Sequence, residues 1–206
     1  MQTTLFDEPI DVFELPSTPG ADLTLDPHLF SPADAERLFH ELHATSAWRH
    51  DTIHRYGRQM PVPRLTAWFG QRKFSYTYSG IRMDPTPWTE PMLEVKAAVE
   101  AATGVQFNSA LANLYRDGQD SVAWHADDET ELGPRPIIAS VSFGATRPFQ
   151  LRRHDDHSTR LSIPLTPGSL LVMGGATQHH WQHRIAKTAK PTAPRINLTF
   201  RQIQLT

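Results

Sequence analysis

The stretch SVAWHADDE at residues 121–129 joins an apolar segment directly to a histidine and two aspartates. Burying such charged groups costs free energy unless a metal ion, or water at a loop, compensates them. His125 and Asp127 are two residues apart, so both side chains would point to the same face of a strand. Two histidines and one carboxylate are the ligands that hold non-haem Fe(II) with open coordination positions. The stretch therefore predicts two ligands of a metal site, with a distant histidine as the third.

The same spacing occurs a second time, so the spacing alone is weak evidence. The chain has 11 histidines, and His-x-Asp pairs are expected by chance at this frequency. His154 and Asp156 form the second pair, within RRHDDHSTR, where no apolar residues support a strand. We expect that run to be a solvated loop.

The segment HHWQHRI offers the third histidine. As a strand it places His179, Trp181 and His183 on one face. A histidine in such a strand is more often an ordinary core residue than a ligand. The segment alone does not distinguish His179 from His183.

The last apolar segment, PRINLTFR, alternates polar and apolar residues. As a strand, its polar face holds Arg195, Asn197, Thr199 and Arg201. An amphipathic strand with one face in water would need no ligand. If the polar face pointed into a barrel instead, its two guanidiniums would need anions. Their Cα atoms would be ~20 Å apart at ~3.3 Å per residue, which leaves room for a small dicarboxylate between the side chains.

The elements that must position these residues are two helices followed by short strands. Ser31 and Pro32 supply an N-cap and a first-turn proline for a helix through about His43. Apolar spacing predicts a second helix over residues 89–103, ended by Gly104. From residue 110 the period is two, with eight strand candidates: ALANLYR, SVAWHA, IIASVSFG, RPFQLRR, RLSIPL, SLLVMG, HWQHRI and PRINLTFRQI. This order predicts a mainly β, α+β fold: a double-stranded β-helix (jelly roll) with N-terminal helices.

We expect an extended N-terminal arm at residues 1–30 and a single domain at residues 31–206. Within the domain, residues 49–80 are basic, aromatic and interrupted by Pro and Gly, which predicts hairpins and loops. The jelly-roll core is predicted at residues 110–206.

Composition excludes several classes of protein. The chain has 206 residues and no cysteine, so disulfides, zinc fingers of the cysteine type and thiol catalysis are excluded. The start MQTTLFDEPI does not have the pattern of a signal peptide, and no apolar run is long enough for a bilayer. The net charge of -2 disfavours a globally basic nucleic-acid binder but averages over local patches. We expect a cytoplasmic monomer.

Taken together, NLYRDG, WHADDE, SVSFGATRPFQLR, GSLLVM, HWQHR and APRINLTFR resemble the AlkB family of Fe(II)/2-oxoglutarate-dependent dioxygenases, over roughly residues 50–205. The resemblance is strongest to the branch that acts on double-stranded DNA. It implies the iron ligands His125, Asp127 and His183, since His179 is too far from Arg195. It implies that 2-oxoglutarate is bound by Asn113, Tyr115, Arg195, Asn197, Thr199 and Arg201.

The resemblance also implies an activity. Family members use Fe(II), 2-oxoglutarate and O2 to demethylate N-alkylated bases, typically 1-methyladenine and 3-methylcytosine in DNA, and release succinate, CO2 and formaldehyde. This is direct-reversal DNA repair. Three alternatives stay open: the same chemistry on RNA or single strands, oxidation of small molecules or protein side chains, and a nucleic-acid-binding protein without catalysis.

The resemblance implies that residues 49–80 form a nucleotide-recognition lid. A base flipped out of the duplex needs a wedge and a pocket. The stretch HRYGRQMPVPR resembles the family loop that enters the base stack, with Tyr56 as the wedge. Tyr76 and Tyr78 could line the base pocket, and Asp128 could accept a hydrogen bond from an exocyclic amine. A basic run would contact phosphates: Arg55, Arg58, Arg64, Arg72 and Lys73. Each of these residues could instead be an ordinary surface or core residue.

The N-terminus carries one further motif. Gln2, Leu5 and Phe6 resemble the Gln-x-x-Leu-Phe peptide with which bacterial repair proteins bind the sliding clamp. The alternative is that Leu5 and Phe6 cover the domain.

Overall fold

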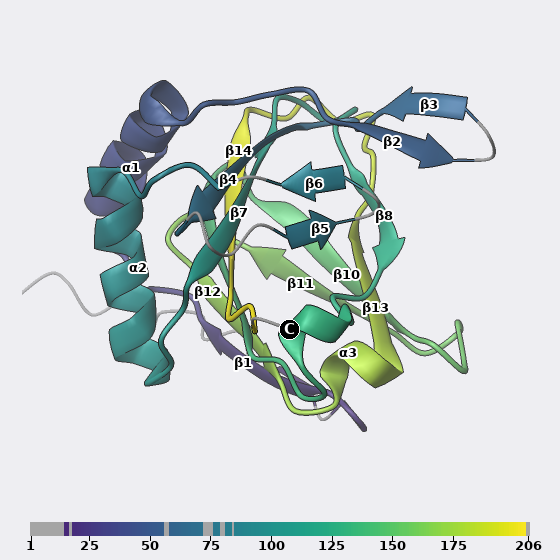
Figure 1. Cartoon of the computed structure of the whole chain (residues 1–206). Helices are drawn as coiled ribbons and strands as arrows, with labels where there is room; N and C mark the ends of the chain where they lie inside the picture. The colour runs from purple at the N-terminus through teal and green to yellow at the C-terminus, as the bar shows by residue number, and fades with distance from the viewer. Residues whose placement is uncertain are drawn as a thin grey trace, which may run out of the picture.

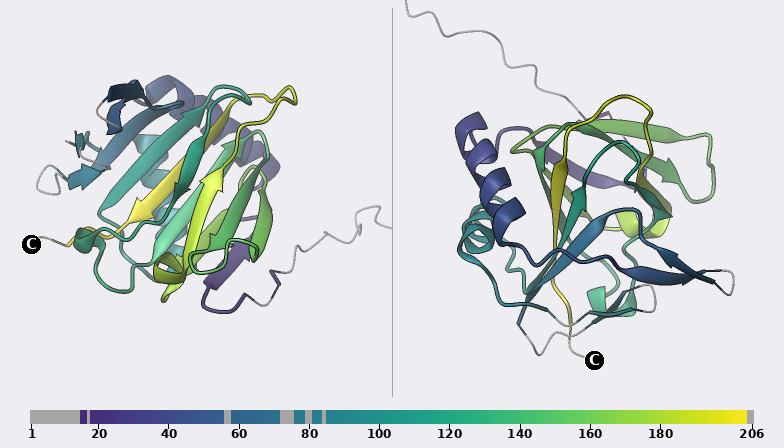
Figure 2. Two further views of the ribbon diagram at one scale, coloured as in Figure 1. Left: turned by 90° about the vertical axis from the view of Figure 1, so that its right-hand side faces the viewer. Right: turned by 90° about the horizontal axis from the view of Figure 1, so that it is seen from above.

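The computed structural model describes residues 15–16, 18–55, 58–71, 76–78, 81–83 and 85–204. Two antiparallel sheets face each other in this part of the chain, and two helices cover the outer face of the larger sheet (Figures 1 and 2). The predicted architecture, mainly β with N-terminal helices, is confirmed. Among the described residues, no helix combines the length and apolar character needed to cross a membrane.

Each sheet is built from segments far apart in the sequence. The larger sheet has the order β1 (Asp22–Asp26), β12 (Leu170–Gly174), β9 (Ile138–Gly144), β14 (Arg195–Arg201), β7 (Ser109–Tyr115), β4 (Leu65–Gly70). The smaller sheet has the order β11 (Arg160–Leu165), β10 (Arg147–Arg153), β13 (Trp181–Ile185), β8 (Val122–His125). All eight strands predicted after residue 110 are present.

The two helices begin and end where the sequence predicts. Helix α1 (Pro32–Thr45) starts after Ser31, whose hydroxyl accepts a hydrogen bond from the Asp34 N–H at 3.2 Å. Helix α2 (Glu90–Thr103) ends at Gly104, which has a left-handed φ of 69°. Their apolar faces pack against the larger sheet and form one hydrophobic core with it.

Strand β14 contributes to two environments because its side chains alternate. Ile196, Leu198 and Phe200 belong to the core shared with the helices. The polar side chains of the strand are buried on the opposite face, which lines a cavity between the sheets. The predicted alternation of β14 is therefore confirmed, and its polar face does not point to water.

The N-terminal boundary differs from the expectation. Residues 22–26, which we assigned to an extended arm, form β1 and pair with β12 over five residues. Leu23 and Leu25 pack against the core between the sheets. The arm prediction is thus wrong for β1, because an edge strand of the main sheet is part of the domain. Residues 1–14, including Gln2, Leu5 and Phe6, lie outside the described residues.

The predicted lid contains hairpins, as expected, and one strand that was not. Strands β2 (Thr52–Arg55) and β3 (Arg58–Pro61) form one pair, which projects at the upper right of Figure 1, and β5 (Tyr76–Tyr78) and β6 (Ile81–Met83) form another. Between them, β4 pairs with β7 along the edge of the main sheet. Its LTAWFG sequence is mostly buried, so the lid prediction is wrong for this segment.

Candidate metal and cosubstrate site

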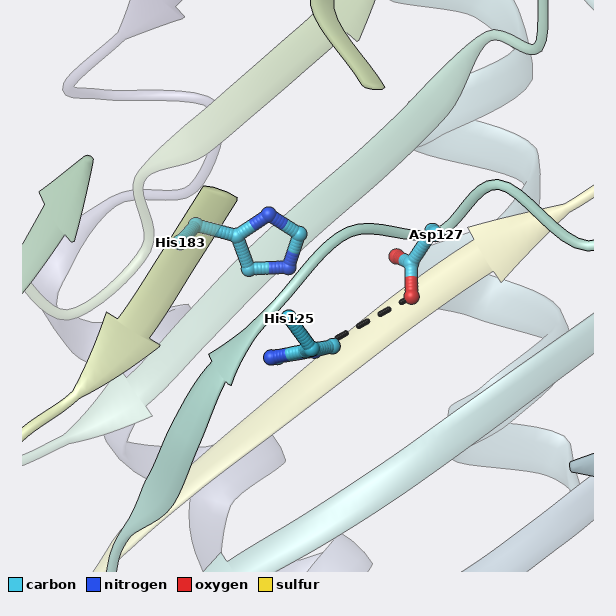
Figure 3. A group of neighbouring side chains, drawn as sticks. All are labelled: His125, Asp127 and His183. Carbon is cyan, nitrogen blue, oxygen red and sulfur yellow. Dashed lines mark ion pairs between the residues drawn. The ribbon is translucent and has the colours of Figure 1, made fainter. Parts of the chain in front are cut away.

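Three predicted ligands meet at the open edge of the smaller sheet. His125 is the last residue of β8 and is paired across the strands with His183 of β13, while Asp127 lies in the loop after β8 (Figure 3). One ligand atom of each residue lies within 4.8 Å of the others, and His125 Nε2 is 4.0 Å from Asp127 Oδ1. In the described part of the chain, no other group of three or more His, Cys, Asp or Glu has this geometry. A single ion could contact all three.

The rejected candidates lie elsewhere. His179 is not on the strand with His183, as we had expected, but in the short helix α3 (Thr177–His180), where it is exposed and its Nε2 contacts the Pro134 carbonyl. His154 and Asp156 are exposed, and Asp156 accepts hydrogen bonds from a turn that follows it. The structure therefore separates His183 from His179, a choice that the sequence of this segment leaves open.

The carboxylate of Asp127 is held ionised inside the protein. It is 1% exposed, and Nη2 of Arg201 donates to both of its oxygens at 2.9 Å. Burial alone would raise the pKa of Asp127, but the Arg201 cation and the two imidazoles lower it to about 2. Because a carboxylate has about four acceptor positions, these bonds leave positions for a metal.

Both imidazoles are held in the neutral form that binds metals. Burial lowers the pKa of His183 to about 3, and repulsion from His125, when that ring is protonated, and from the Arg201 cation adds to this effect. Burial also lowers the pKa of His125. The ring of Phe149 stacks on His183 with centroids 5.1 Å apart, and the Ala123 carbonyl lies 2.9 Å from His125 Nδ1. This contact leaves Nε2 of His125 for the triad.

One cavity connects the triad with the polar face of β14. Its lining includes all nine residues predicted for metal and cosubstrate: His125, Asp127, His183, Asn113, Tyr115, Arg195, Asn197, Thr199 and Arg201. These residues come from both sheets. The structure therefore brings together residues that are up to 88 positions apart.

Arg195 has the properties of an anion site. It is 1% exposed, its Nη2 donates to Ser142 Oγ at 2.9 Å, and its Nε and Nη1 have no hydrogen-bond partner among the described residues. Burial lowers the pKa of Arg195 to about 10, which still leaves it charged at neutral pH. Such a buried cation is costly until an anion reaches it, and a carboxylate suits its fork.

We expected both arginines of β14 to bind an anion from outside the protein, and Arg201 differs from this expectation. Its anion in the structure is Asp127, so β14 of the larger sheet is bonded directly to the loop after β8. Arg195 therefore has donors available for an external carboxylate, while binding of 2-oxoglutarate by Arg201 stays a prediction.

The predicted substrate residues fall into three groups. Arg64 is 7% exposed, lines the cavity, and donates from Nε to Asn113 Oδ1 at 2.6 Å, so a phosphate contact does not fit its position. Asp128 is exposed next to the triad. The backbones of Tyr76 and Tyr78 lie on β5, with side chains outside the description, and Tyr56 lies outside the described residues.

Sequence reasoning missed several residues that line the cavity or bond to its lining residues. Ser140 and Ser142 lie on β9, where Ser140 accepts from Asn197 and Ser142 accepts from Arg195. The alternation in IASVSFG is a signal for such an inward polar face. Phe149 and Gln178 gave no comparable signal, because one reads as a core residue and the other as a loop residue.

Comparisons with known proteins decide the family. The model described as "2OG-Fe(II) oxygenase superfamily" matches residues 22–201. "Alpha-ketoglutarate-dependent dioxygenase alkB homolog 3" of Bos taurus is 44% identical over 203 residues, covering 93% of this chain and 70% of that protein. "DNA oxidative demethylase ALKBH2" of Homo sapiens is 40% identical over 188 residues, covering 86% and 72%. The chain belongs to the AlkB family of Fe(II)/2-oxoglutarate-dependent dioxygenases.

The fold agrees with AlkB family membership. A solved structure titled "The structure of OsALKBH1" matches with a TM-score of 0.61 at 19% identity, covering 90% of this chain and 99% of that one. The double-stranded β-helix prediction is thereby confirmed. Enzymes of this family use Fe(II), 2-oxoglutarate and O2. The neutral imidazoles, the ionised Asp127 and the buried Arg195 fit that requirement.

Proposed function

We propose that the protein is an oxidative demethylase of N-alkylated bases in DNA, such as 1-methyladenine and 3-methylcytosine, and that it repairs them by direct reversal. The observation that carries the proposal is a cavity lined by both the His-Asp-His triad and Arg195. The Nε and Nη1 donors of Arg195 have no hydrogen-bond partner among the described residues. The relative named a DNA oxidative demethylase supports DNA as the substrate class.

The residues divide into a metal group and a cosubstrate group. His125, Asp127 and His183 would hold Fe(II), and Arg195 would bind the distal carboxylate of 2-oxoglutarate beside Tyr115. When bound, the metal, 2-oxoglutarate and O2 supply oxidation of the N-methyl carbon, with succinate, CO2 and formaldehyde as products. Apolar side chains in the lining, such as Leu111, Phe149 and Ile185, would limit the access of water to the reacting groups.

Arg201 and Asn113 would then orient the two groups. Arg201 keeps Asp127 ionised and fixes the direction of its carboxylate. Arg64 donates to the amide oxygen of Asn113, so the Asn113 amide is oriented by the residue that directly precedes β4. Asn197 donates to Ser140 Oγ and the Val141 carbonyl, which locks its position in the larger sheet.

A base must leave the duplex to reach this cavity, at a cost of a few kcal/mol. A wedge at Tyr56, a base pocket at Tyr76 and Tyr78, and an acceptor at Asp128 remain predictions for that step. Duplex DNA is favoured by the Tyr56 loop only, and RNA or single strands are the runner-up substrates. Clamp binding through Gln2, Leu5 and Phe6, a monomeric state and a cytoplasmic location also remain predictions.

The decisive experiment is anaerobic reconstitution with Fe(II) and 2-oxoglutarate, followed by exposure to O2 with methylated oligonucleotides. Mass spectrometry should show loss of one methyl group and release of formaldehyde, both abolished by Asp127→Ala. Parallel duplex, single-stranded and RNA substrates rank the alternatives. Consumption of 2-oxoglutarate without loss of methyl from any of them would contradict the repair proposal and favour another substrate class.

A further inference from the structure

Asp127 needs support that its strand does not provide. Strand β8 ends at His125, so the main chain at Asp127 is outside the sheet ladder. Arg201 fixes the carboxylate end of the residue. The main-chain end is held by a side chain from another part of the fold: the Asp127 N–H donates to Gln178 Oε1 at 2.9 Å.

Gln178 is itself fixed by its surroundings. It is 3% exposed and lies in α3, the short helix between β12 and β13. Its Nε2 donates to Met173 Sδ at 3.6 Å, so both ends of the amide have a partner. Thr177 anchors the helix to β12, because its hydroxyl donates to the Gly174 carbonyl at 2.6 Å. The acceptor for Asp127 therefore stands on an anchored segment.

Gln178 links two predicted metal ligands: it bonds to Asp127, and it is close to His183 in the sequence. It precedes His183 by five residues, and β13 starts directly after α3. A shift of Asp127 relative to Gln178 would change the spacing between the carboxylate and the imidazole of His183. Groups that bond to metal ligands in this way commonly alter metal affinity 10–100-fold when removed.

We propose that Gln178 is a positioning residue for the metal site, which sets the main chain of Asp127 at the distance from His183 that one ion requires. This inference rests on the proposed metal role of the triad. The alternative is that Gln178 only fills a buried space and stabilises the fold.

The test measures binding of Co(II) alone to the metal-free protein, by the absorption of the bound ion, together with thermal unfolding of the metal-free form. Gln178→Met keeps the length and burial of the side chain and removes the acceptor. We expect it to weaken Co(II) binding about 10–100-fold and to change the absorption spectrum. Gln178→Glu retains an oxygen at the acceptor position and should recover much of the affinity.

A matched control separates positioning from stability. Asn108→Leu removes another amide that bonds to main chain, at the N–H and carbonyl of Ile203, and Asn108 does not line the cavity. It should lower the melting temperature and leave Co(II) affinity within about twofold. Should Gln178→Met fail to fold, Gln178→Asn, whose amide is one methylene too short, enters the same comparison.

Two results would overturn the inference: Co(II) affinity of Gln178→Met within about twofold of the parent, or equal losses in Gln178→Met and Asn108→Leu. Failure of the underlying metal site has a different signature. In that case the parent would not bind Co(II), or Asp127→Ala would bind it equally well.

Discussion

The imidazoles of His125 and His183 make the stability of the metal-free protein depend on pH. Burial lowers the pKa of His183 to about 3 and also lowers the pKa of His125. Histidines of the unfolded chain bind protons at about pH 6.5. Below that pH the unfolded state therefore holds more protons than the folded state, and the free energy of unfolding falls as the pH falls toward 3.

Replacing one imidazole should reduce this dependence. We expect His183→Leu to lower the slope of unfolding free energy against pH by about 1.4 kcal/mol per pH unit between pH 6 and 4. Urea unfolding in the presence of a chelator measures the slope. Asn108→Leu should lower stability equally at each pH. Parallel curves for His183→Leu and the parent would refute the assignment of the slope to this residue.

Arg195 should show opposite effects on stability and on cosubstrate binding. Because two of its donors lack partners in the described structure, we expect Arg195→Met to leave the unfolding free energy unchanged or raise it. The same change should raise the KM for 2-oxoglutarate by about 10–100-fold, as loss of a charge-assisted bond does. Arg195→Lys should show a smaller increase in KM. An unchanged KM in Arg195→Met would show that the distal carboxylate of 2-oxoglutarate is bound by another residue.

At the scale of elements, β1 offers a test of where the domain begins. Leu23 packs against the core between the sheets, whereas its neighbour Thr24 is exposed. We expect Leu23→Asp to lower the free energy of unfolding by about 2 kcal/mol and Thr24→Asp to change it by less than about 0.5 kcal/mol. Denaturant unfolding measures both. If both variants change the free energy of unfolding by the same small amount, β1 is an external arm and not part of the domain.

Elements with a clear period could be predicted, and those whose role depends on distant pairing could not. Both helices have caps and apolar spacing. In the strand segments after residue 110, apolar and polar residues alternate, and turn residues separate one segment from the next. Strand β4 is buried on both faces, so LTAWFG shows no alternation that would mark it as part of the main sheet. Strand β1 is short, and its partner strand β12 lies more than 140 residues further along the chain.

In the candidate site, too, the residues marked by periodicity could be predicted, and the contacts between distant segments could not. His125 and the polar face of β14 could be found from spacing, because alternation determines which side chains share a face. The bond from Arg201 to Asp127 could not, since it joins two sheets that only the tertiary fold brings together. Nor could the bond from the Asp127 N–H to Gln178, because it joins the loop after β8 to the short helix α3, which lies about 50 residues further along the chain.

For the molecule as a whole, charge should govern binding to nucleic acid. The net charge is -2, so on the proposed function the attraction to phosphates would come from local groups, and the candidates are Arg55 and Arg58, which are register partners in the β2–β3 pair. The logarithm of affinity for a methylated duplex should fall with log salt by ~0.9 per phosphate contacted. Replacing both arginines by Gln should reduce that slope by about 2.

The control for this prediction lies on the opposite side of the molecule. Arg37 is on α1 and forms ion pairs with Asp34, Glu41 and Glu94, so its charge is already compensated (Figure 1). Arg37→Gln should leave the salt slope unchanged. A slope that does not respond to the hairpin arginines would place the nucleic acid on another surface.

The buried Arg195 and the His-Asp-His triad belong to different sheets, and this division bears on how a reaction cycle would end. On the proposed assignment, a keto-diacid spans the gap and braces the two sheets against each other. Its oxidation would leave a diacid one carbon shorter and without the keto oxygen, which would span the distance between the two anchors less well. The product would then be held more weakly than the cosubstrate, and this difference in length would favour its release.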